Sequence, residues 1–111
     1  MNINSFETEW KWGKLITIMI DNAGKVELEL YKGYNYVYLN GLMVAPDSRK
    51  KGLGTALMKK AEEITKELGF DEIQLKVQQD HTFQYEWYVR LGYKLIIDDQ
   101  DEGYKYLRKQ L

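Results

Sequence analysis

The first half of the chain alternates apolar and polar residues in the manner of β-strands. Residues 14–21 are rich in β-branched side chains, which predicts a strand buried on both faces. Residues 25–31 alternate cleanly, and the polar turn before them predicts a hairpin in which Gly24 is free to adopt a positive φ. Residues 36–44 form a third predicted strand, and Gly41 within it indicates a β-bulge or a close approach of another backbone.

The second half of the chain switches between helical and strand periodicity. The predicted elements are a helix over about 52–68 that ends at Gly69, a strand over 71–77, a helix over 82–91 that ends at Gly92, and strands over 93–97 and about 103–108. The strand–helix–strand spacing requires a right-handed parallel crossover. The pattern therefore predicts an α/β fold, a β-meander followed by βαβαββ, with a mixed sheet and helices on its faces.

Residues 1–13 fit two interpretations. Trp10 and Trp12 alternate with charged neighbours, so this piece is either a short edge strand or an arm packed by its tryptophans. No repeat, linker or low-complexity segment interrupts the pattern. At 111 residues we expect one domain, spanning 1–111.

Composition excludes several classes of protein. With 44% hydrophobic and 30% charged residues the chain is globular, and a net charge of −1 gives no general attraction to nucleic acid or to an anionic membrane. No apolar run approaches the ~20 residues of a membrane span, and the first residues lack the pattern of a secretion signal. The absence of cysteine excludes disulfides, a thiol nucleophile and a thiolate metal site. We expect a cytoplasmic protein without a metal.

The stretch from Leu42 to Leu57 carries the main candidate chemistry. An apolar strand breaks at Pro46, passes a basic run and enters a helix through a glycine-bearing turn. The basic run is Arg49, Lys50 and Lys51, and the turn is Gly52, Leu53, Gly54 and Thr55. A helix N-terminus presents unpaired N–H groups and roughly half a positive charge, and glycine lets a ligand approach the backbone. This arrangement predicts a phosphate site.

Two familiar phosphate-binding motifs do not match this stretch. The dinucleotide fingerprint requires a third glycine, at the position that Leu57 occupies. The nucleoside-triphosphate loop requires glycine followed by Lys-Ser or Lys-Thr, and the chain has no such run.

Two motifs of the chain resemble those of a known family. Arg49-Lys-Lys-Gly52-Leu-Gly54 resembles the Arg/Gln-x-x-Gly-x-Gly/Ala signature of the GNAT acetyltransferase superfamily. Trp87-Tyr88-Val-Arg-Leu91-Gly92-Tyr93 resembles that family's second motif. Both occur in the family's order, with a helix and a strand between them, over roughly the last two-thirds of the chain. The resemblance implies a mostly antiparallel sheet with a central splayed pair of parallel strands.

The resemblance also implies an acyl-coenzyme A ligand, with acetyl-CoA as co-substrate. Its pyrophosphate would lie on the N–H groups from about Lys50 to Thr55. Its pantetheine arm would hydrogen-bond the main chain of the strand that ends with Leu42, Met43 and Val44. A backbone amide near Met43 or Val44 would polarise the thioester carbonyl.

Two side chains near the second motif have alternative interpretations. In the family pattern Tyr88 protonates the departing thiolate, whereas the alternative is core packing. Phe83, Trp87 and Leu91 share a helical stripe from which Tyr88 lies about 100° away, which favours the catalytic role. His81 either contacts the cofactor or is a surface residue at a helix entry, and a lone histidine without cysteine does not predict a metal site.

The acceptor side departs from the family pattern. Members usually have a further strand and two helices before the hairpin, and those helices wall the acceptor site, so we expect this chain to lack the strand and the helix pair. Tyr38 and Asn40 occupy the positions where a carboxylate base is usual. Glu27, Glu29 and the acidic turn 98–102 are possible substitutes, although exposed carboxylates usually only solubilise and the turn is more typical of a solvated loop.

These observations predict an acetyl-CoA-dependent N-acetyltransferase that transfers its acetyl group directly to an amine of a small molecule, peptide or protein. The alternative is a non-catalytic acyl-CoA-binding or regulatory module. We expect no nucleic-acid or membrane partner. We also expect a homodimer whose partner chain walls the acceptor side, because the N-terminal half gathers aromatic residues of the kind found at interfaces: Trp10, Trp12, Tyr34, Tyr36 and Tyr38. A monomer with a shallow open groove is the alternative.

Overall fold

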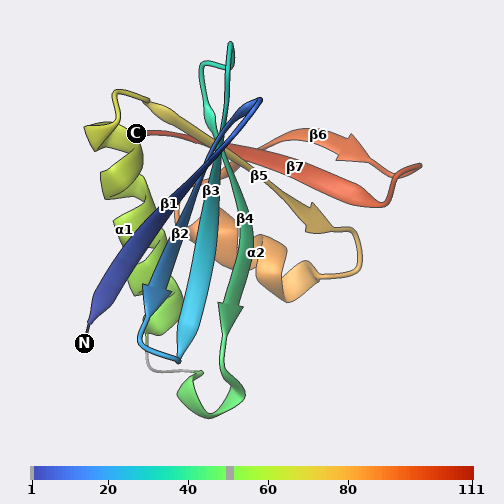
Figure 1. Cartoon of the computed structure of the whole chain (residues 1–111). Coiled ribbons are helices and arrows are strands. Elements are labelled where there is room, and N and C mark those ends of the chain that lie inside the picture. The colour runs from blue at the N-terminus through green and yellow to red at the C-terminus, as the bar shows by residue number, and fades with distance from the viewer. Residues whose placement is uncertain (1, 50–51) are drawn as a thin grey trace.

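The computed structural model describes residues 2–49 and 52–111, which form one mixed sheet and two α-helices (Figure 1). The strands are β1 (Ile3–Trp10), β2 (Gly13–Ile20), β3 (Gly24–Tyr31), β4 (Val37–Val44), β5 (Glu72–Gln78), β6 (Lys94–Asp99) and β7 (Tyr104–Gln110). The helices are α1 (Leu53–Glu67), α2 (Thr82–Arg90) and the short 3-10 helix η1 (Pro46–Ser48). Every element predicted from the hydrophobic pattern is present, with bounds that differ by at most about two residues.

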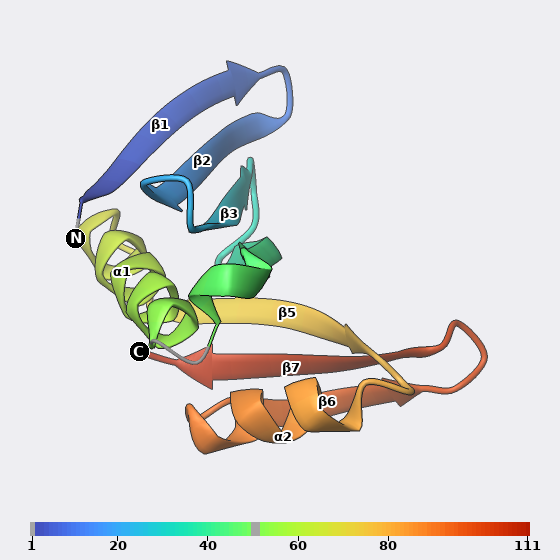
Figure 2. The ribbon, with the colours of Figure 1, turned by 90° about the horizontal axis from the view of Figure 1, so that it is seen from below.

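The seven strands form a single sheet in the order β1-β2-β3-β4-β5-β7-β6. All neighbouring pairs are antiparallel except β4 and β5, which are parallel. The half formed by β1, β2 and β3 is turned away from the half formed by β5, β7 and β6 (Figure 2). The predicted fold class and the predicted splayed parallel pair are confirmed.

The core lies between the sheet and the helices. From α1 it receives Leu57, Met58 and Ala61, which are at most 1% exposed. The sheet supplies alternate apolar residues of its strands: Ile16, Ile18, Ile20, Val26, Leu28, Val37, Leu39, Ile73, Leu75, Val77 and Leu107. The apolar positions that predicted the strands and α1 are therefore the positions that face this core. Within the described residues no helix is long and apolar enough to cross a membrane.

Both helices pack on the same face of the sheet. Lys105 and Lys109 share a face of β7, since they are four residues apart in one strand. Lys105 lies over the ring of Tyr85 in α2, at 5.5 Å from the ring centroid, and Lys109 binds Glu62 in α1. Both helices also lie behind the sheet in Figure 1. The opposite face of the sheet therefore has no helix over it in the described part of the chain.

This uncovered face explains a difference from the pattern predicted for residues 14–21. Ile16, Ile18 and Ile20 of β2 are at most 2% exposed, but Leu15 and Met19, on the other face, are only partly buried. The strand was predicted to be buried on both faces. Only one face is fully buried, because no helix packs against the other.

The N-terminal residues form an edge strand, which confirms the first of the two interpretations. β1 pairs with β2 along its whole length, from Ile3 opposite Ile20 to Trp10 opposite Gly13. Trp12 is 64% exposed, and Trp10 packs edge-on against Tyr31 of β3. The expectation that the additional N-terminal strand is missing is wrong. The missing feature is the helix pair, because a two-residue turn of Lys11 and Trp12 joins β1 directly to β2.

The turn between β2 and β3 differs from the prediction in its positive φ. Asp21, with φ of 44°, takes the left-handed conformation, whereas Gly24 does not. Gly24 is needed for a different reason. A Cβ on Gly24 would lie 3.0 Å from the carbonyl oxygen of Met43 and 3.1 Å from Cδ1 of Leu57, so its small size lets β3, β4 and α1 approach.

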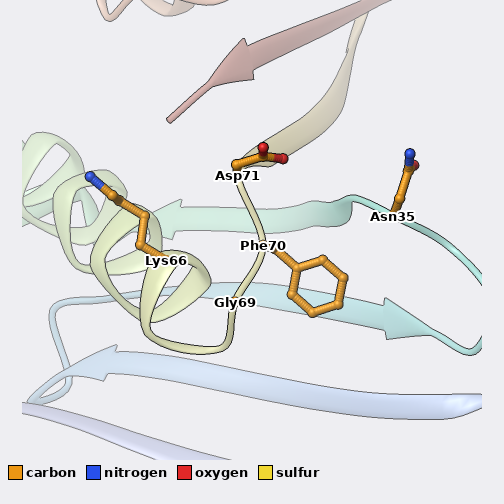
Figure 3. A pocket seen from close by; sticks show the side chains of 5 residues that line it. All are labelled: Asn35, Lys66, Gly69, Phe70 and Asp71. Carbon is orange, nitrogen blue, oxygen red and sulfur yellow. The ribbon is translucent and has the colours of Figure 1, made fainter.

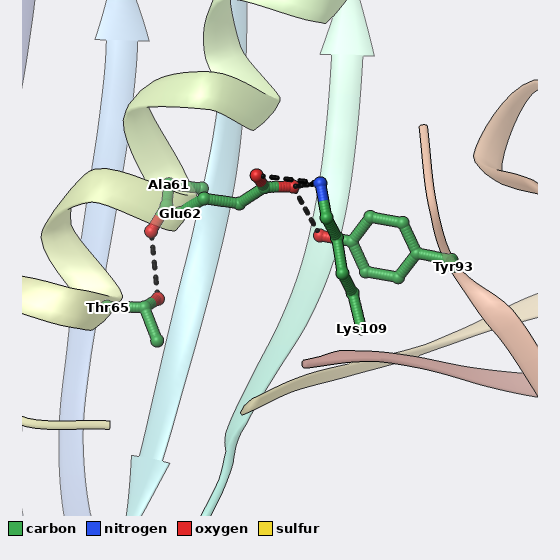
Figure 4. A network of polar contacts seen from close by, with 5 residues as sticks. All are labelled: Ala61, Glu62, Thr65, Tyr93 and Lys109. Carbon is green, nitrogen blue, oxygen red and sulfur yellow. Dashed lines mark hydrogen bonds and ion pairs between the residues drawn. The ribbon is translucent and has the colours of Figure 1, made fainter. Parts of the chain in front are cut away.

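A polar network links α1 to the C-terminal half of the sheet (Figure 4). The Lys109 ammonium lies 3.0 and 3.1 Å from the two carboxylate oxygens of Glu62, and the Tyr93 hydroxyl donates to Glu62 Oε2 at 3.1 Å. Burial is the main cause that raises the pKa of Tyr93, and the Glu62 carboxylate raises it further. Within the described sheet, the two halves are hydrogen-bonded to each other only through β4 and β5. The network adds a polar connection between α1 and the C-terminal half.

Candidate active site

The parallel strands β4 and β5 separate after a short stretch of pairing. Their described ladder contains two residue pairs, Val37 with Ile73 and Tyr38 with Gln74. Beyond Tyr38 the edge of β4 that faces β5 is no longer paired with it. Main-chain N–H and C=O groups at such a separation remain available to a ligand that lies between the strands.

A β-bulge lies in the separated part of β4. The pairing with β3 shifts between Lys25 and Glu27, and Gly41 has φ of 65°, as expected for a glycine bulge. This confirms the bulge predicted at Gly41. The strand ends beyond it with Leu42 and Val44 partly buried and Met43 62% exposed. The structure thus places these three predicted ligand-binding residues together at the open end of β4.

The N-terminus of α1 has the features of an anion site. Gly52 is the N-cap residue, with φ of 77°, and gives no side-chain hydrogen bond to the helix. The first helical bond runs from the Ala56 N–H to the Gly52 carbonyl at 3.0 Å. The N–H groups of residues 53–55 therefore have no partner within the helix, and a Cβ on Gly52 would meet no atom of the described residues within 4 Å. An anion can approach this turn closely.

Gly54 packs against α2, and its contact with the cofactor stays a prediction. A Cβ on Gly54 would lie 3.4 Å from Cζ2 of Trp87 and 3.9 Å from Cγ2 of Val44. Its missing side chain therefore lets the Trp87 indole approach the first turn of α1, and its Cβ direction does not point to open space. The other two turn residues, Leu53 and Thr55, are partly buried and exposed, respectively.

The side chain of Arg49 contacts the end of β4. Its Nε donates a hydrogen bond to the Val44 carbonyl oxygen at 3.2 Å, across η1. This contact ties the loop that follows β4 to the strand. The predicted phosphate-site residues Lys50 and Lys51 lie outside the described residues.

Tyr88 is the one buried residue of α2, with 4% of its surface exposed. Its ring makes edge contacts with Trp87 and Tyr93, at centroid separations of 5.0 and 5.8 Å. Burial raises its pKa to about 12, although Gln84 one turn earlier acts in the opposite sense. The hydroxyl is therefore protonated at neutral pH and is a hydrogen-bond donor.

The stripe predicted for α2 is confirmed for Trp87 and Leu91, which pack against the core, and is wrong for Phe83. Phe83 was expected on the packing stripe with Trp87 and Leu91, but it is 78% exposed. Tyr88 was expected to lie off that stripe, but it faces the core. The hydrophobic pattern of α2 did not reveal this because both of its candidate faces are aromatic.

His81 lies at the entry of α2, as its second interpretation predicted. It is the N-cap residue, its ring is 51% exposed, and its nearest polar contacts are Gln84 at 3.4 Å and Asp80 at 3.8 Å. A cofactor contact by His81 stays a prediction.

Two carboxylates lie on the uncovered face beside the separated part of β4. Glu27 and Glu29 of β3 are the pairing partners of Asn40 and Tyr38. Glu29 accepts hydrogen bonds from the Tyr31 hydroxyl and from Asn40 Nδ2, the latter at 3.1 Å. The Glu29 contact raises the pKa of Tyr31 to about 12, and burial is the main cause that raises the pKa of Tyr38 to about 12.

Two other features do not contribute to this site. A shallow surface depression of about 490 Å³ is lined by Asn35, Lys66, Gly69, Phe70 and Asp71 (Figure 3). It lies at the opposite ends of β4 and β5, where both strands begin. The acidic residues 98–102 close the β6–β7 hairpin, and no cluster of three or more His, Cys, Asp or Glu within residues 2–49 and 52–111 is arranged to hold a metal.

Comparison with known proteins gives a family match. The model of the acetyltransferase (GNAT) family matches residues 7–93. A comparison with curated proteins gives no match.

Several solved structures are similar over most of the chain. PaiA N-acetyltransferase from Thermoplasma acidophilum, in complex with coenzyme A, is 24% identical with a TM-score of 0.74, over 87% of this chain and 60% of that one. A putative streptothricin acetyltransferase from Bacillus anthracis, in complex with acetyl-coenzyme A, is 18% identical with a TM-score of 0.75, over 93% and 65%. A Bacillus subtilis acetyltransferase in complex with coenzyme A is 18% identical with a TM-score of 0.73 and matches over 99% of both chains. This chain therefore spans about 60% of the first structure's length but the whole of the third's.

Proposed function

This chain belongs to the acetyltransferase (GNAT) family, and we propose on that basis that it is an acetyl-coenzyme A-dependent N-acetyltransferase. It transfers the acetyl group directly to an amine of a small molecule, peptide or protein. The observation that carries the proposal is the separation of β4 from β5 next to the glycine-capped N-terminus of α1. One ligand with a polar arm and a pyrophosphate can use both features at once.

The ligand-binding residues follow from this geometry. The N–H groups of residues 53–55 hold the pyrophosphate, and the open conformation of Gly52 admits it. The main chain of residues 42–44 holds the pantetheine arm in the space between β4 and β5. Coenzyme A or acetyl-coenzyme A is present in the three similar structures described above, which supports this choice of ligand.

The chain's own groups supply two parts of the chemistry. A backbone amide near Met43 or Val44 donates to the thioester carbonyl oxygen as negative charge develops there. The Tyr88 hydroxyl donates to the departing sulfur. Tyr88 keeps its proton at neutral pH, since the ordinary pKa of tyrosine is about 10 and burial raises it further.

A second candidate function is a module that binds acyl-coenzyme A without transferring the acyl group. The observation that favours it is the turn of Lys11 and Trp12, which stands where the family has the helices that wall the acceptor. Such a module would keep the ligand cleft and lack a complete acceptor site.

Binding and turnover measured together distinguish the two functions. Calorimetry with acetyl-coenzyme A tests the cleft, and release of free thiol is followed with a panel of polyamines, alkylamines and lysine peptides. We expect binding together with amine-dependent thiol release. Binding without release across the panel would favour the non-catalytic module, and absence of binding would contradict both functions.

A further inference from the structure

The carboxylate of Glu27 lies against the main chain of Gly41, at the bulge of β4. A Cβ on Gly41 would be 2.9 Å from Oε1 of Glu27 and 3.6 Å from its Cδ. Real Cβ atoms do not approach that closely, so any other residue at position 41 would displace the carboxylate. Glycine therefore has two functions here, since it takes the positive φ of the bulge and makes room for a neighbouring acidic group.

This position is beside the point where acetyl transfer is proposed. Gly41 directly precedes residues 42–44, whose main chain is proposed to hold the pantetheine arm and the thioester. Glu27 pairs with Asn40, on the sheet face that neither helix covers. Its side chain is 25% exposed, so an acceptor that approaches from this face can reach the carboxylate.

The carboxylate oxygens of Glu27 and Glu29 differ in the number of hydrogen bonds that they accept. Both carboxylate oxygens of Glu29 accept hydrogen bonds, one from Tyr31 and one from Asn40. Among the described residues Glu27 has a single polar contact, with the Lys25 ammonium at 3.5 Å from Oε1. At that length the contact is weak, so Glu27 retains capacity to accept a proton from an incoming group.

We propose that Glu27, and not Glu29 or the acidic turn 98–102, is the acceptor-side base of this protein. This inference rests on the proposed acetyltransferase function. An alkylammonium has a pKa near 10.4, so at pH 7 it carries a positive charge and no free electron pair. A carboxylate beside the thioester attracts the cation and removes the proton that blocks attack.

The acceptor enters as R–NH₃⁺, and Glu27 takes one proton from it, directly or through one water. The amine nitrogen then forms a C–N bond with the acetyl carbonyl carbon, the C–S bond breaks, and the sulfur takes the proton of the Tyr88 hydroxyl. The amide nitrogen loses a second proton to solvent, Tyr88 regains one from solvent, and Glu27 releases its own, so one proton is released per turnover.

The test compares Glu27→Gln with the wild type across pH, on the fastest of three named amines: spermidine, n-butylamine and an Nα-acetylated lysine peptide. We expect kcat/KM at pH 7 to fall by about 10²-fold or more, with acetyl-coenzyme A affinity by calorimetry unchanged. The deficit should shrink as pH approaches about 10, where the amine loses its proton without help. A deficit that is constant across pH would assign Glu27 a structural role and overturn the inference.

Glu29→Gln is the matched control, because it removes the same charge from the same strand and face. We expect it to lower kcat/KM by less than about threefold, since Glu29 is held by Tyr31 and Asn40. An equal loss in both variants would overturn the inference in favour of a general effect of charge on this face. Wild-type kinetics in Glu27→Gln would overturn the inference alone, whereas a wild-type protein that acetylates none of the amines would refute the proposed function.

Gly41→Ala provides a second route to the same group. The new Cβ displaces the Glu27 carboxylate but leaves its charge in place, so a folded Gly41→Ala protein should show the same pH-dependent deficit. Circular dichroism establishes that the variant is folded. A folded variant with wild-type activity would show that the position of the carboxylate over the bulge is not used, which contradicts the inference.

Discussion

The indole of Trp87 in α2 lies over Gly54 in the first turn of α1, where a Cβ would be 3.4 Å from Cζ2 and 3.5 Å from Cη2 of the ring. The two residues come from the two motifs that identify the family. Their contact joins the N-terminus of α1, the proposed pyrophosphate site, to the residue before Tyr88. The packing of one motif against the other thus determines the relative positions of the ligand site and the proposed proton donor.

This contact predicts that stability and acetyl-coenzyme A binding depend on the size of the side chain at position 54 more than on the backbone freedom of glycine. In Gly54→Ala the Cβ makes an ordinary contact, so we expect stability within about 1 kcal/mol of the wild type. In Gly54→Leu the side chain overlaps the indole, and we expect a loss of about 1–3 kcal/mol together with weaker acetyl-coenzyme A binding. Urea denaturation and calorimetry measure both. Trp87→Leu combined with Gly54→Leu should recover part of the stability, and absence of recovery would contradict the proposed cause.

Gly52 predicts a separate effect through the backbone. Its φ of 77° is costly for any other residue, so Gly52→Ala should lose roughly 1–2 kcal/mol of stability and bind acetyl-coenzyme A several-fold more weakly. Gly33→Ala is a matched control, because Gly33 has φ of 86° and equally open surroundings but lies in the turn between β3 and β4. It should lose similar stability and keep full affinity. Equal loss of affinity in both variants would remove Gly52 from the proposed site.

Tyr88→Phe tests the proposed proton donor. The ring stays in its contacts with Trp87 and Tyr93, so we expect little change in stability or in acetyl-coenzyme A affinity. The kcat for amine acetylation should fall by about 10²- to 10⁴-fold, since the hydroxyl acts mainly in the transition state. Steady-state and single-turnover kinetics at saturating substrates measure this. An unchanged single-turnover rate would mean that Tyr88 is only a packing residue.

The raised tyrosine pKa values predict a loss of stability at alkaline pH. Tyr31, Tyr38 and Tyr88 have pKa values of about 12, above the ordinary value of about 10 in the unfolded chain. Between these values the folded protein binds more protons than the unfolded one, so stability is present below pH 10 and is lost as pH rises towards 12. Thermal melts from pH 8 to 12 and the phenolate absorbance measure the two effects. Constant stability through this range, or ionisation of all tyrosines near pH 10, would contradict the prediction.

The fold could be predicted from the sequence because its signals are local. Alternation in residues 25–31 and the helical period after Gly52 depend only on near neighbours, and the glycines at positions 69 and 92 adopt the positive φ expected at helix ends. The bulge at Gly41 was predictable for the same reason. The strand–helix–strand spacing predicted the parallel pair, and the family resemblance implied that this pair is central and splayed.

The errors concern contacts between distant segments. Tyr88 is buried and packs edge-on against Tyr93, whereas Phe83 is exposed, and neither fact is visible in the helical period of α2. The packing roles of Gly24 and Gly54 require knowledge of Leu57 and Trp87 in three dimensions. The proximity of Glu27 to Gly41 depends on the register between β3 and β4, which the bulge itself shifts by one residue. Sequence reasoning had Glu27 among its candidate carboxylates but had no means to choose between them.

The fold offers a candidate interface for the predicted homodimer. Aromatic rings form a continuous series at one end of the sheet, with centroid separations of 5.9 Å from Trp10 to Tyr31, 5.4 Å from Tyr31 to Tyr34 and 5.3 Å from Tyr34 to Tyr36. Tyr34 is 51% exposed. β1 is an edge strand, and the sheet face beside it has no helix over it in the described residues. Exposed aromatic groups and an unpaired strand edge favour association, and aromatic residues are enriched where subunits meet.

We therefore expect a dimer of twice the 13.2 kDa chain mass, about 26 kDa, in sedimentation velocity at micromolar protein. Tyr34→Ser should shift the equilibrium towards monomer by removing an exposed ring from the series, whereas Phe83→Ser, a control with an even more exposed ring on α2, should not. A 13 kDa species at all concentrations would refute the dimer. It would instead favour a monomer with an open acceptor side. Such a monomer suits an amine on a large substrate, because no helix within residues 2–49 and 52–111 covers the sheet face that carries Glu27.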